Sequence, residues 1–168
     1  VAIIPAVILS DEPCILENVP KISDVSISLK ILHEMGATVE MIDKTTFRID
    51  ASALKNYIVP YEMARKMRAS YYFLGACIGK FRKAMVSMPG GCPLGDRPID
   101  QHLKAFTALG AKCEIDQGMV NVEADSLYGN QIYLDVVSVG ATINAMLASV
   151  KAQGLTIIEN AAKEPHIV

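Results

Sequence analysis

The chain has 168 residues, of which 51% are apolar and 20% are charged, and its formal net charge is −2. This length fits one domain with a sizeable core. The small negative charge provides no basic field for nucleic acid, so nucleic acid is not expected as a partner. No apolar run reaches the roughly 18 residues that a membrane span needs. The high apolar fraction predicts that some of the surface faces a partner or another domain.

In chain order, the patterns of apolar residues and breakers predict alternating helices and strands. The expected strands cover residues 14–19, 38–41, 47–51, 85–88, 112–115, 120–124 and 156–161. The expected helices include residues 6–9, 29–36, 73–81, 103–110 and 143–150, and helix starts are expected at 64–70, after Pro98 and at 136–142. This alternation favours an α/β fold.

An internal repeat organises these elements. LKILHEMGA at residues 29–37 matches LKAFTALGA at 103–111, and each is followed by two short strands. Gly36 and Gly110 are expected to cap the two helices. Counting back from these glycines puts Cys92 at the position of Asn18, and CILENV at 14–19 matches TIIENA at 156–161, which makes Asn160 the third equivalent. The alternative is a chance likeness between two α/β segments.

The expected unit runs strand, loop, helix, strand, strand, helix. We place the units at residues 1–84, 85–154 and 155–168, the third being incomplete, so the chain holds about two and a fraction units. The chain begins at Val1, and its first nine residues lack the basic flank of a signal peptide. We therefore expect part of a longer cytoplasmic protein.

The cysteines are too few and too scattered for a disulfide scaffold, and none forms a CxxC pair. They are Cys14, Cys77, Cys92 and Cys113. All but Cys92 lie in apolar runs, where a buried and inert thiol is expected. The three histidines show no metal-ligand spacing, and His102 and His166 are interpreted as surface or capping residues.

The loop SMPGGCPLGDRPID at residues 87–100 combines a thiol, a cation and a helix start. Its glycines let the backbone approach a ligand, and Arg97 with the following helix N-terminus favours an anion. Pro98 is expected at the first helical position, and Asp100 either caps the helix or contacts a ligand. Cys92 could act as a nucleophile with a lowered pKa or as a protonated acid.

Two further helix starts are suited to phosphate groups. ARKMRAS at 64–70 carries three cations in four residues, for which a solvated charged turn is the usual explanation. VVSVGAT at 136–142 offers backbone N–H groups and a Ser hydroxyl.

Taken together, the 87–100 loop, SVGAT at 138–142 and IENAAKEP at 158–165 resemble UDP-N-acetylglucosamine enolpyruvyl transferases over essentially the whole chain. The resemblance implies an inside-out α/β barrel of βαβαββ units and a cytoplasmic enzyme of peptidoglycan synthesis, with no cofactor. It implies addition of the sugar 3-hydroxyl to phosphoenolpyruvate and elimination of phosphate. Cys92 would donate the proton, and fosfomycin would alkylate the same thiol.

The resemblance also implies which residues contact the substrates. Arg97 would contact phosphate or carboxylate, and Arg68 would lie at the nucleotide-sugar site. Pro98, Ile99, Asp100 and Gln101 would line the uridine side, and Val136, Val137, Ser138 and Val139 would contact the diphosphate. Some members carry Lys where this chain has Val136, so a charge contact is absent here.

The phosphoenolpyruvate-binding Lys-Asn pair and the second domain of the family do not occur in this chain, so the chain by itself is expected to be inactive. A non-catalytic nucleotide-sugar-binding or structural module on the same scaffold is the alternative. A weaker one is a thiol-dependent redox protein, which would need a resolving cysteine near Cys92.

Overall fold

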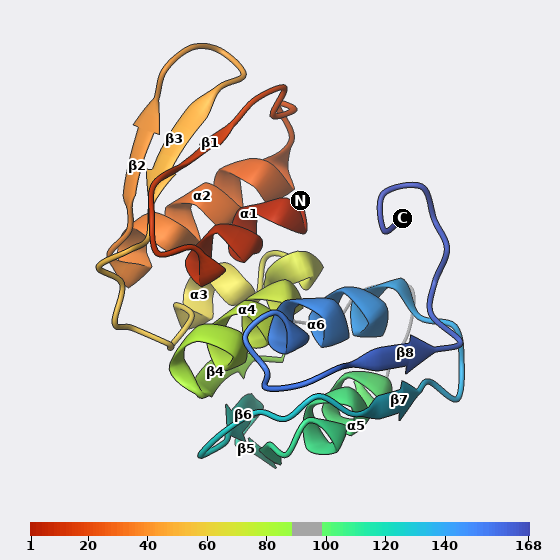
Figure 1. Ribbon diagram of the computed structural model, residues 1–168. Helices are drawn as coiled ribbons and strands as arrows, with labels where there is room; N and C mark the ends of the chain where they lie inside the picture. The colour runs from red at the N-terminus through yellow and green to blue at the C-terminus, as the bar shows by residue number, and fades with distance from the viewer. Residues whose placement is uncertain (89–98) are drawn as a thin grey trace.

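The computed structural model describes residues 1–88 and 99–168 of the chain. Helices and strands alternate along it, as the sequence predicts (Figure 1). The strands are β1 (Cys14–Leu16), β2 (Thr38–Met41), β3 (Phe47–Asp50), β4 (Lys83–Ser87), β5 (Lys112–Asp116), β6 (Met119–Glu123), β7 (Gln131–Tyr133) and β8 (Ile157–Glu159). The helices are α1 (Ile3–Ala6), η1 (Val7–Leu9), α2 (Ser23–Met35), α3 (Tyr61–Ala64), η2 (Arg68–Tyr71), α4 (Tyr72–Phe81), α5 (Asp100–Ala108) and α6 (Val139–Ser149), where η denotes a 3-10 helix.

The strands form three small sheets. Two are antiparallel and have the same topology, with orders β1-β3-β2 and β4-β6-β5, and the third pairs β7 and β8 in parallel. Each antiparallel sheet contains the hairpin that follows the repeated helix end, β2-β3 after α2 and β5-β6 after α5. The repeated helix and hairpin of the sequence therefore recur in space, while the exact unit boundaries remain a prediction.

The helix ends follow the expected chemistry. Gly36 and Gly110 adopt φ values of +110° and +98°, a left-handed conformation that ends a helix at little cost for glycine. Asn18 and Asn160 also share a left-handed backbone, with φ of 55° and 54°, which supports their equivalence.

The expected equivalence of Cys92 and Asn18 is wrong. The N–H of Val19 donates to Thr45 O at 2.8 Å, and the N–H of Met88 makes the matching bond to Gly118 O at 2.7 Å. Met88 is therefore the counterpart of Val19. The strand registers match Val86 with Leu16, so the single residue Ser87 spans the two positions of Glu17 and Asn18. Counting from the helix ends fails because α5 is shorter than α2, 9 residues against 13, and the connection before it is longer.

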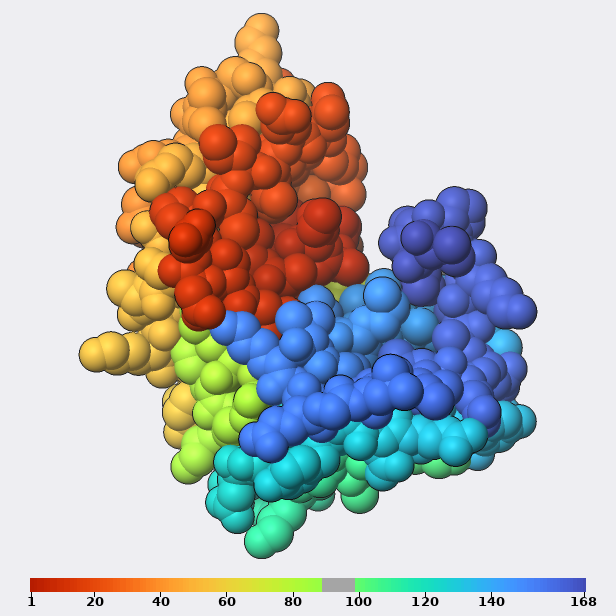
Figure 2. All heavy atoms as spheres, viewed as in Figure 1, coloured from red at the N-terminus to blue at the C-terminus, as the bar shows by residue number. Residues whose placement is uncertain are grey.

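The core is built around α4, which is almost entirely buried and lies beside α6 (Figure 1). Phe73, Leu74 and Ile78 are fully buried on it. In Figure 2 the β1–β3 lobe, in red and orange, stands apart from the C-terminal segment in dark blue. Among residues 1–88 and 99–168, no helix is both long and apolar enough to span a bilayer.

Candidate functional site

Three segments meet at the first turn of α6: the helix η2, the first turn of α5, and the loop between β7 and α6. The His102 ring on α5 lies 5.9 Å from the ring of Tyr71 on η2. A Cβ built on Gly140, in α6, would lie 2.8 Å from His102 Nε2. Every predicted site residue that the structure describes, from Arg68 to Val139, belongs to these three segments.

Gln101 joins α5 to the loop before α6. Its side chain is 6% exposed. Nε2 donates to Asp100 Oδ2 at 2.9 Å and to Asp135 Oδ2 at 3.1 Å, and Oε1 accepts from the N–H of Asp135 at 2.8 Å. Gln101 was predicted to contact a ligand. In this structure its amide group instead forms hydrogen bonds within the protein, and these join the first turn of α5 to the loop before α6.

Asp135 is a residue that the sequence did not single out. Lys104 Nζ lies 2.6 Å from Asp135 Oδ1 and 5.8 Å from the centre of the Tyr133 ring. The hydrogen bond from Lys104, followed by that from Gln101, lowers the pKa of the Asp135 carboxyl. The loop before α6 is therefore anchored by a charged carboxylate.

The start of α6 behaves as a capped helix N-terminus. Ser138 has an extended backbone, and its Oγ accepts from the N–H of Ala141 at 3.3 Å. The Ser hydroxyl, expected to be available for a ligand, thus already caps the helix. Val136 and Val137, just before it, are 60% and 61% exposed, a large apolar exposure at the entrance to the turn.

The interpretation of His102 as a surface or capping residue is wrong. The side chain is buried, with 7% exposure, and its Nδ1 has no hydrogen-bond partner among the described residues. Burial, with the nearby charge of Arg68, lowers the pKa of His102 to about 4, and Asp100 opposes this shift weakly. His102 is therefore neutral near pH 7. His166 is exposed, as expected.

A sequence signal for His102 did exist. His102, Ala105, Phe106 and Leu109 follow the spacing of a buried helical stripe, and all four are buried. The histidine occupies a core position of α5 and packs against the two neighbouring segments.

Arg68 begins η2, directly before α4, and its side chain is exposed. Its positive charge acts to lower the pKa values of Tyr71, Tyr72 and His102. Burial raises the pKa of Tyr71 to about 12, and Arg68 partly offsets this effect. An exposed guanidinium beside uncharged, largely buried rings is suited to binding an anion.

The first turn of α5 carries Ile99, 6% exposed, as N-cap residue and Asp100, exposed, as first helical residue. The helix start expected after Pro98 is therefore found, with Asp100 as the first residue of α5. Cys92, Arg97 and Pro98 lie outside the described residues.

The other cysteines agree only in part with the expectation of buried, inert thiols. Cys77 is fully buried, and burial raises its pKa far above the usual range. Cys14 and Cys113 are half-buried, and burial also raises the pKa of Cys113. The described residues contain no group of three or more His, Cys, Asp or Glu side chains placed to hold a metal ion.

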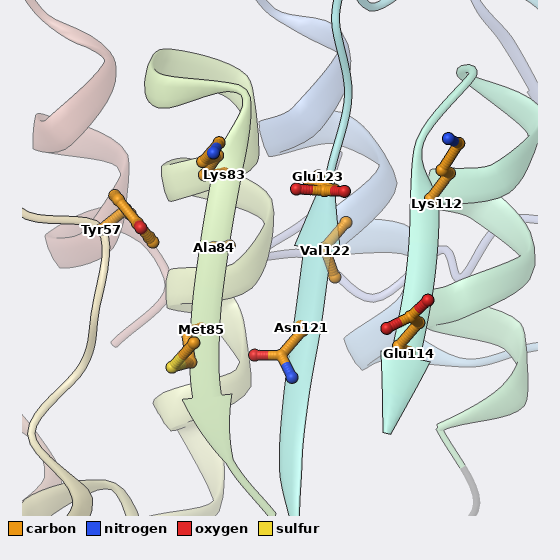
Figure 3. Close-up of a pocket in the computed structure, with 9 residues that line it drawn as sticks. All are labelled: Tyr57, Lys83, Ala84, Met85, Lys112, Glu114, Asn121, Val122 and Glu123. Atoms are coloured by element: carbon orange, nitrogen blue, oxygen red, sulfur yellow. The ribbon is translucent and has the colours of Figure 1, made fainter. Parts of the chain in front are cut away.

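A hollow of about 230 Å³ lies elsewhere, on the outer face of the β4-β6-β5 sheet beside Tyr57 (Figure 3). Lys83, Glu123 and Lys112 lie opposite one another across the three strands there. Alternating charges on a sheet face are typical of a solvated surface. None of the predicted site residues that the structure describes lines this hollow.

The comparisons with known proteins identify the family. The family model for EPSP synthase (3-phosphoshikimate 1-carboxyvinyltransferase) matches residues 1–168. The chain belongs to this family. Its sequence is 51% identical to UDP-N-acetylglucosamine 1-carboxyvinyltransferase 3 of Caldanaerobacter subterraneus and 54% identical to UDP-N-acetylglucosamine 1-carboxyvinyltransferase 2 of Listeria monocytogenes. Both matches cover 100% of this chain and 40% of the relative, so the chain spans well under half the length of these family members.

Solved structures show the same fold. The enolpyruvyl transferase NikO from Streptomyces tendae matches 99% of this chain and 39% of its own, with a TM-score of 0.84 at 22% identity. EPSP synthase from Acinetobacter baumannii matches 98% of this chain and 40% of its own, with a TM-score of 0.74 at 17% identity. The expected enolpyruvyl-transferase fold is confirmed as a partial α/β fold, and the resemblance seen in the sequence is confirmed by these family relatives.

Proposed function

We propose that the protein containing this chain transfers the enolpyruvyl group of phosphoenolpyruvate to the 3-hydroxyl of UDP-N-acetylglucosamine, with release of phosphate. The observation that carries the proposal is the meeting of Arg68, the 99–101 turn and the start of α6 at one junction. Relatives 51% and 54% identical over the whole chain bear the name of this activity.

The site residues divide between the two parts of a nucleotide sugar. The segment that leads into α6, from Val136 to Val139, offers backbone N–H groups and the helix dipole to the diphosphate, and Arg68 adds a cation beside it. The turn at Ile99, Asp100 and Gln101 forms the uridine side together with Pro98. Val136 cannot provide a cation, so this part of the contact is made by backbone and apolar surface.

The reaction has two steps. In the addition, the sugar 3-hydroxyl loses its proton as its oxygen bonds to C2 of phosphoenolpyruvate, and a proton is added to the methylene carbon. In the elimination, that carbon loses a proton and the bond from C2 to the phosphate oxygen breaks. Cys92 is the proposed proton donor, and Arg97 the proposed contact to phosphate or carboxylate, both in the loop that precedes α5.

This reaction belongs to the first committed step of peptidoglycan synthesis, so we place the protein in the cytoplasm, with roles in cell shape and division. Because the chain spans 40% of its relatives, the complete active site requires the rest of their length. The 168-residue chain alone is therefore expected to be inactive.

The first test is substrate dependence in the protein of full length. Phosphate should be released from phosphoenolpyruvate only when UDP-N-acetylglucosamine is present. Binding of the nucleotide sugar in calorimetry without any phosphate release would instead support the non-catalytic module.

The second test concerns the thiol. Fosfomycin should label the protein at one cysteine, and Cys92→Ser should abolish the labelling. Cys113→Ser is the matched control, because that half-buried thiol has a raised pKa and should leave the labelling unchanged. Labelling that survives Cys92→Ser would show that another cysteine reacts.

A further inference from the structure

The first turn of α6 is held by buried polar side chains that no ligand contact explains. Asn144, fully buried on α6, donates from Nδ2 to Gly140 O at 3.1 Å. Its Oδ1 accepts from the N–H of Gly75 on α4 at 2.8 Å. Only this orientation of the amide satisfies both backbone groups, because an N–H needs an acceptor and a carbonyl needs a donor.

Asn144 can make this bridge because α4 and α6 approach unusually closely. A Cβ on Gly75 would lie 2.7 Å from the backbone oxygen of Asn144, and a Cβ on Gly79, one turn later, would lie 2.9 Å from Leu147 O. Glycines four residues apart let two helix backbones come together. The amide bridge therefore fixes α6 along and around its own axis relative to α4.

Thr142 makes a second bridge from the same turn. Its side chain is 1% exposed, and Oγ1 donates to Ser138 O at 2.8 Å. The same oxygen accepts from the N–H of Ala162 at 3.0 Å. Thr142 thus ties the start of α6 to the segment after β8.

These two residues, Thr142 and Asn144, form what we call the α6 brace. On the α5 side the same turn is bounded by the His102 ring, which leaves no room for a Cβ at Gly140. The brace uses hydroxyl and amide groups where apolar residues of similar size would fill the same space. Buried polar groups of this kind add little net stability, but they specify geometry, because a displaced partner is left unsatisfied.

We propose that Thr142 and Asn144 are positioning residues for the nucleotide-sugar site. They hold the first turn of α6 in one place and orientation, so that its unpaired N–H groups face the diphosphate without reorganisation on binding. This inference rests on the function proposed above. It means that Thr142 and Asn144, which are proposed to act without contacting substrate, affect the binding of the nucleotide sugar and not that of phosphoenolpyruvate.

Two variants that conserve side-chain volume test the brace in the protein of full length. Thr142→Val removes the hydroxyl and keeps the shape. Asn144→Asp keeps the acceptor for Gly75 and removes the donor to Gly140.

We expect each variant to weaken the binding of UDP-N-acetylglucosamine roughly tenfold in calorimetry. The KM for phosphoenolpyruvate should stay within about twofold, because the partners of the brace among the described residues lie in α4, in α6 with its N-cap, and in the segment after β8. Amide exchange of residues 139–142 should become faster.

Leu147→Ala is the matched control. Leu147 lies in the C-terminal half of α6 and is 8% exposed, so its truncation destabilises the same helix without releasing the first turn. The control should leave sugar-nucleotide affinity near that of the wild type. If Leu147→Ala lost as much sugar-nucleotide affinity as the brace variants, the effect of the brace would be explained by general destabilisation of α6, and the proposal would be overturned.

The proposed function and the role of the brace can be refuted independently. If wild-type protein does not bind UDP-N-acetylglucosamine, the proposed function is wrong. Unchanged amide exchange at 139–142 in both brace variants overturns the brace whatever the ligand is. Normal affinity combined with faster exchange shows that the turn is held by the brace but that binding does not depend on it, which also overturns the positioning role.

Discussion

The buried His102 makes a quantitative prediction about stability and pH. Its pKa is about 4 in the folded protein, against 6.5 for the free side chain, because burial and Arg68 disfavour the charged imidazolium. Between these two values the unfolded chain takes up a proton that the folded chain does not. Stability therefore falls as the pH falls from 6.5 to about 4.

The magnitude follows from the size of the shift. Each unit of pKa difference corresponds to about 1.4 kcal/mol, so His102 costs the folded state about 3 kcal/mol at the lower end of the window. Above pH 6.5 the cost is absent. The carboxyls with lowered pKa values, such as Asp135, lose their contribution only as the pH falls below about 4. The interval from pH 4.5 to 6.5 therefore isolates the histidine.

Urea unfolding followed by circular dichroism at several pH values measures this effect. The wild type should lose stability steadily across the window, and His102→Gln, which cannot titrate, should show a much flatter profile. His166→Gln is the control, because His166 is exposed and its replacement should leave the wild-type slope. Equal slopes for the wild type and His102→Gln would refute a buried, neutral histidine.

Two further predictions concern packing and reactivity. Gly140→Ala should destabilise the fold by about 1–3 kcal/mol, because its Cβ would lie 2.8 Å from His102 Nε2, and a double-mutant cycle should show most of this cost disappearing in a His102→Ala background. Additive costs would mean that the two residues do not contact. Cys77, fully buried with a raised pKa, should react with thiol reagents only as fast as the protein unfolds; modification under native conditions, followed by mass spectrometry, would contradict its burial.

The sequence by itself determined most of the local structure. Gly36 and Gly110 mark helix ends because only a glycine accepts the left-handed backbone without strain, and this property belongs to the residue itself. The hairpins at 38–50 and 112–123 follow from alternating apolar residues and a turn. The family resemblance rests on contiguous motifs and is likewise local information.

Only the tertiary structure decided which chemistry each polar residue has available. From the sequence, His102 is interpreted as a surface or capping residue. In the structure it is a core residue, because α6 and η2 pack over it. Ser138 and Gln101 appear free to bind a ligand, but Ala141 and Asp135 occupy their side chains. Such pairings depend on segments that lie far apart in the sequence.

The place of Cys92 in the repeat shows the same limit. Counting residues from a helix end assumes equal lengths, whereas the hydrogen bonds of Val19 and Met88 establish the equivalence directly. Those bonds make Met88 the counterpart of Val19, so Cys92, which follows Met88 in the sequence, is not the counterpart of Asn18, which precedes Val19. Strand register is set by pairing across a sheet, so a single stretch of sequence does not specify it.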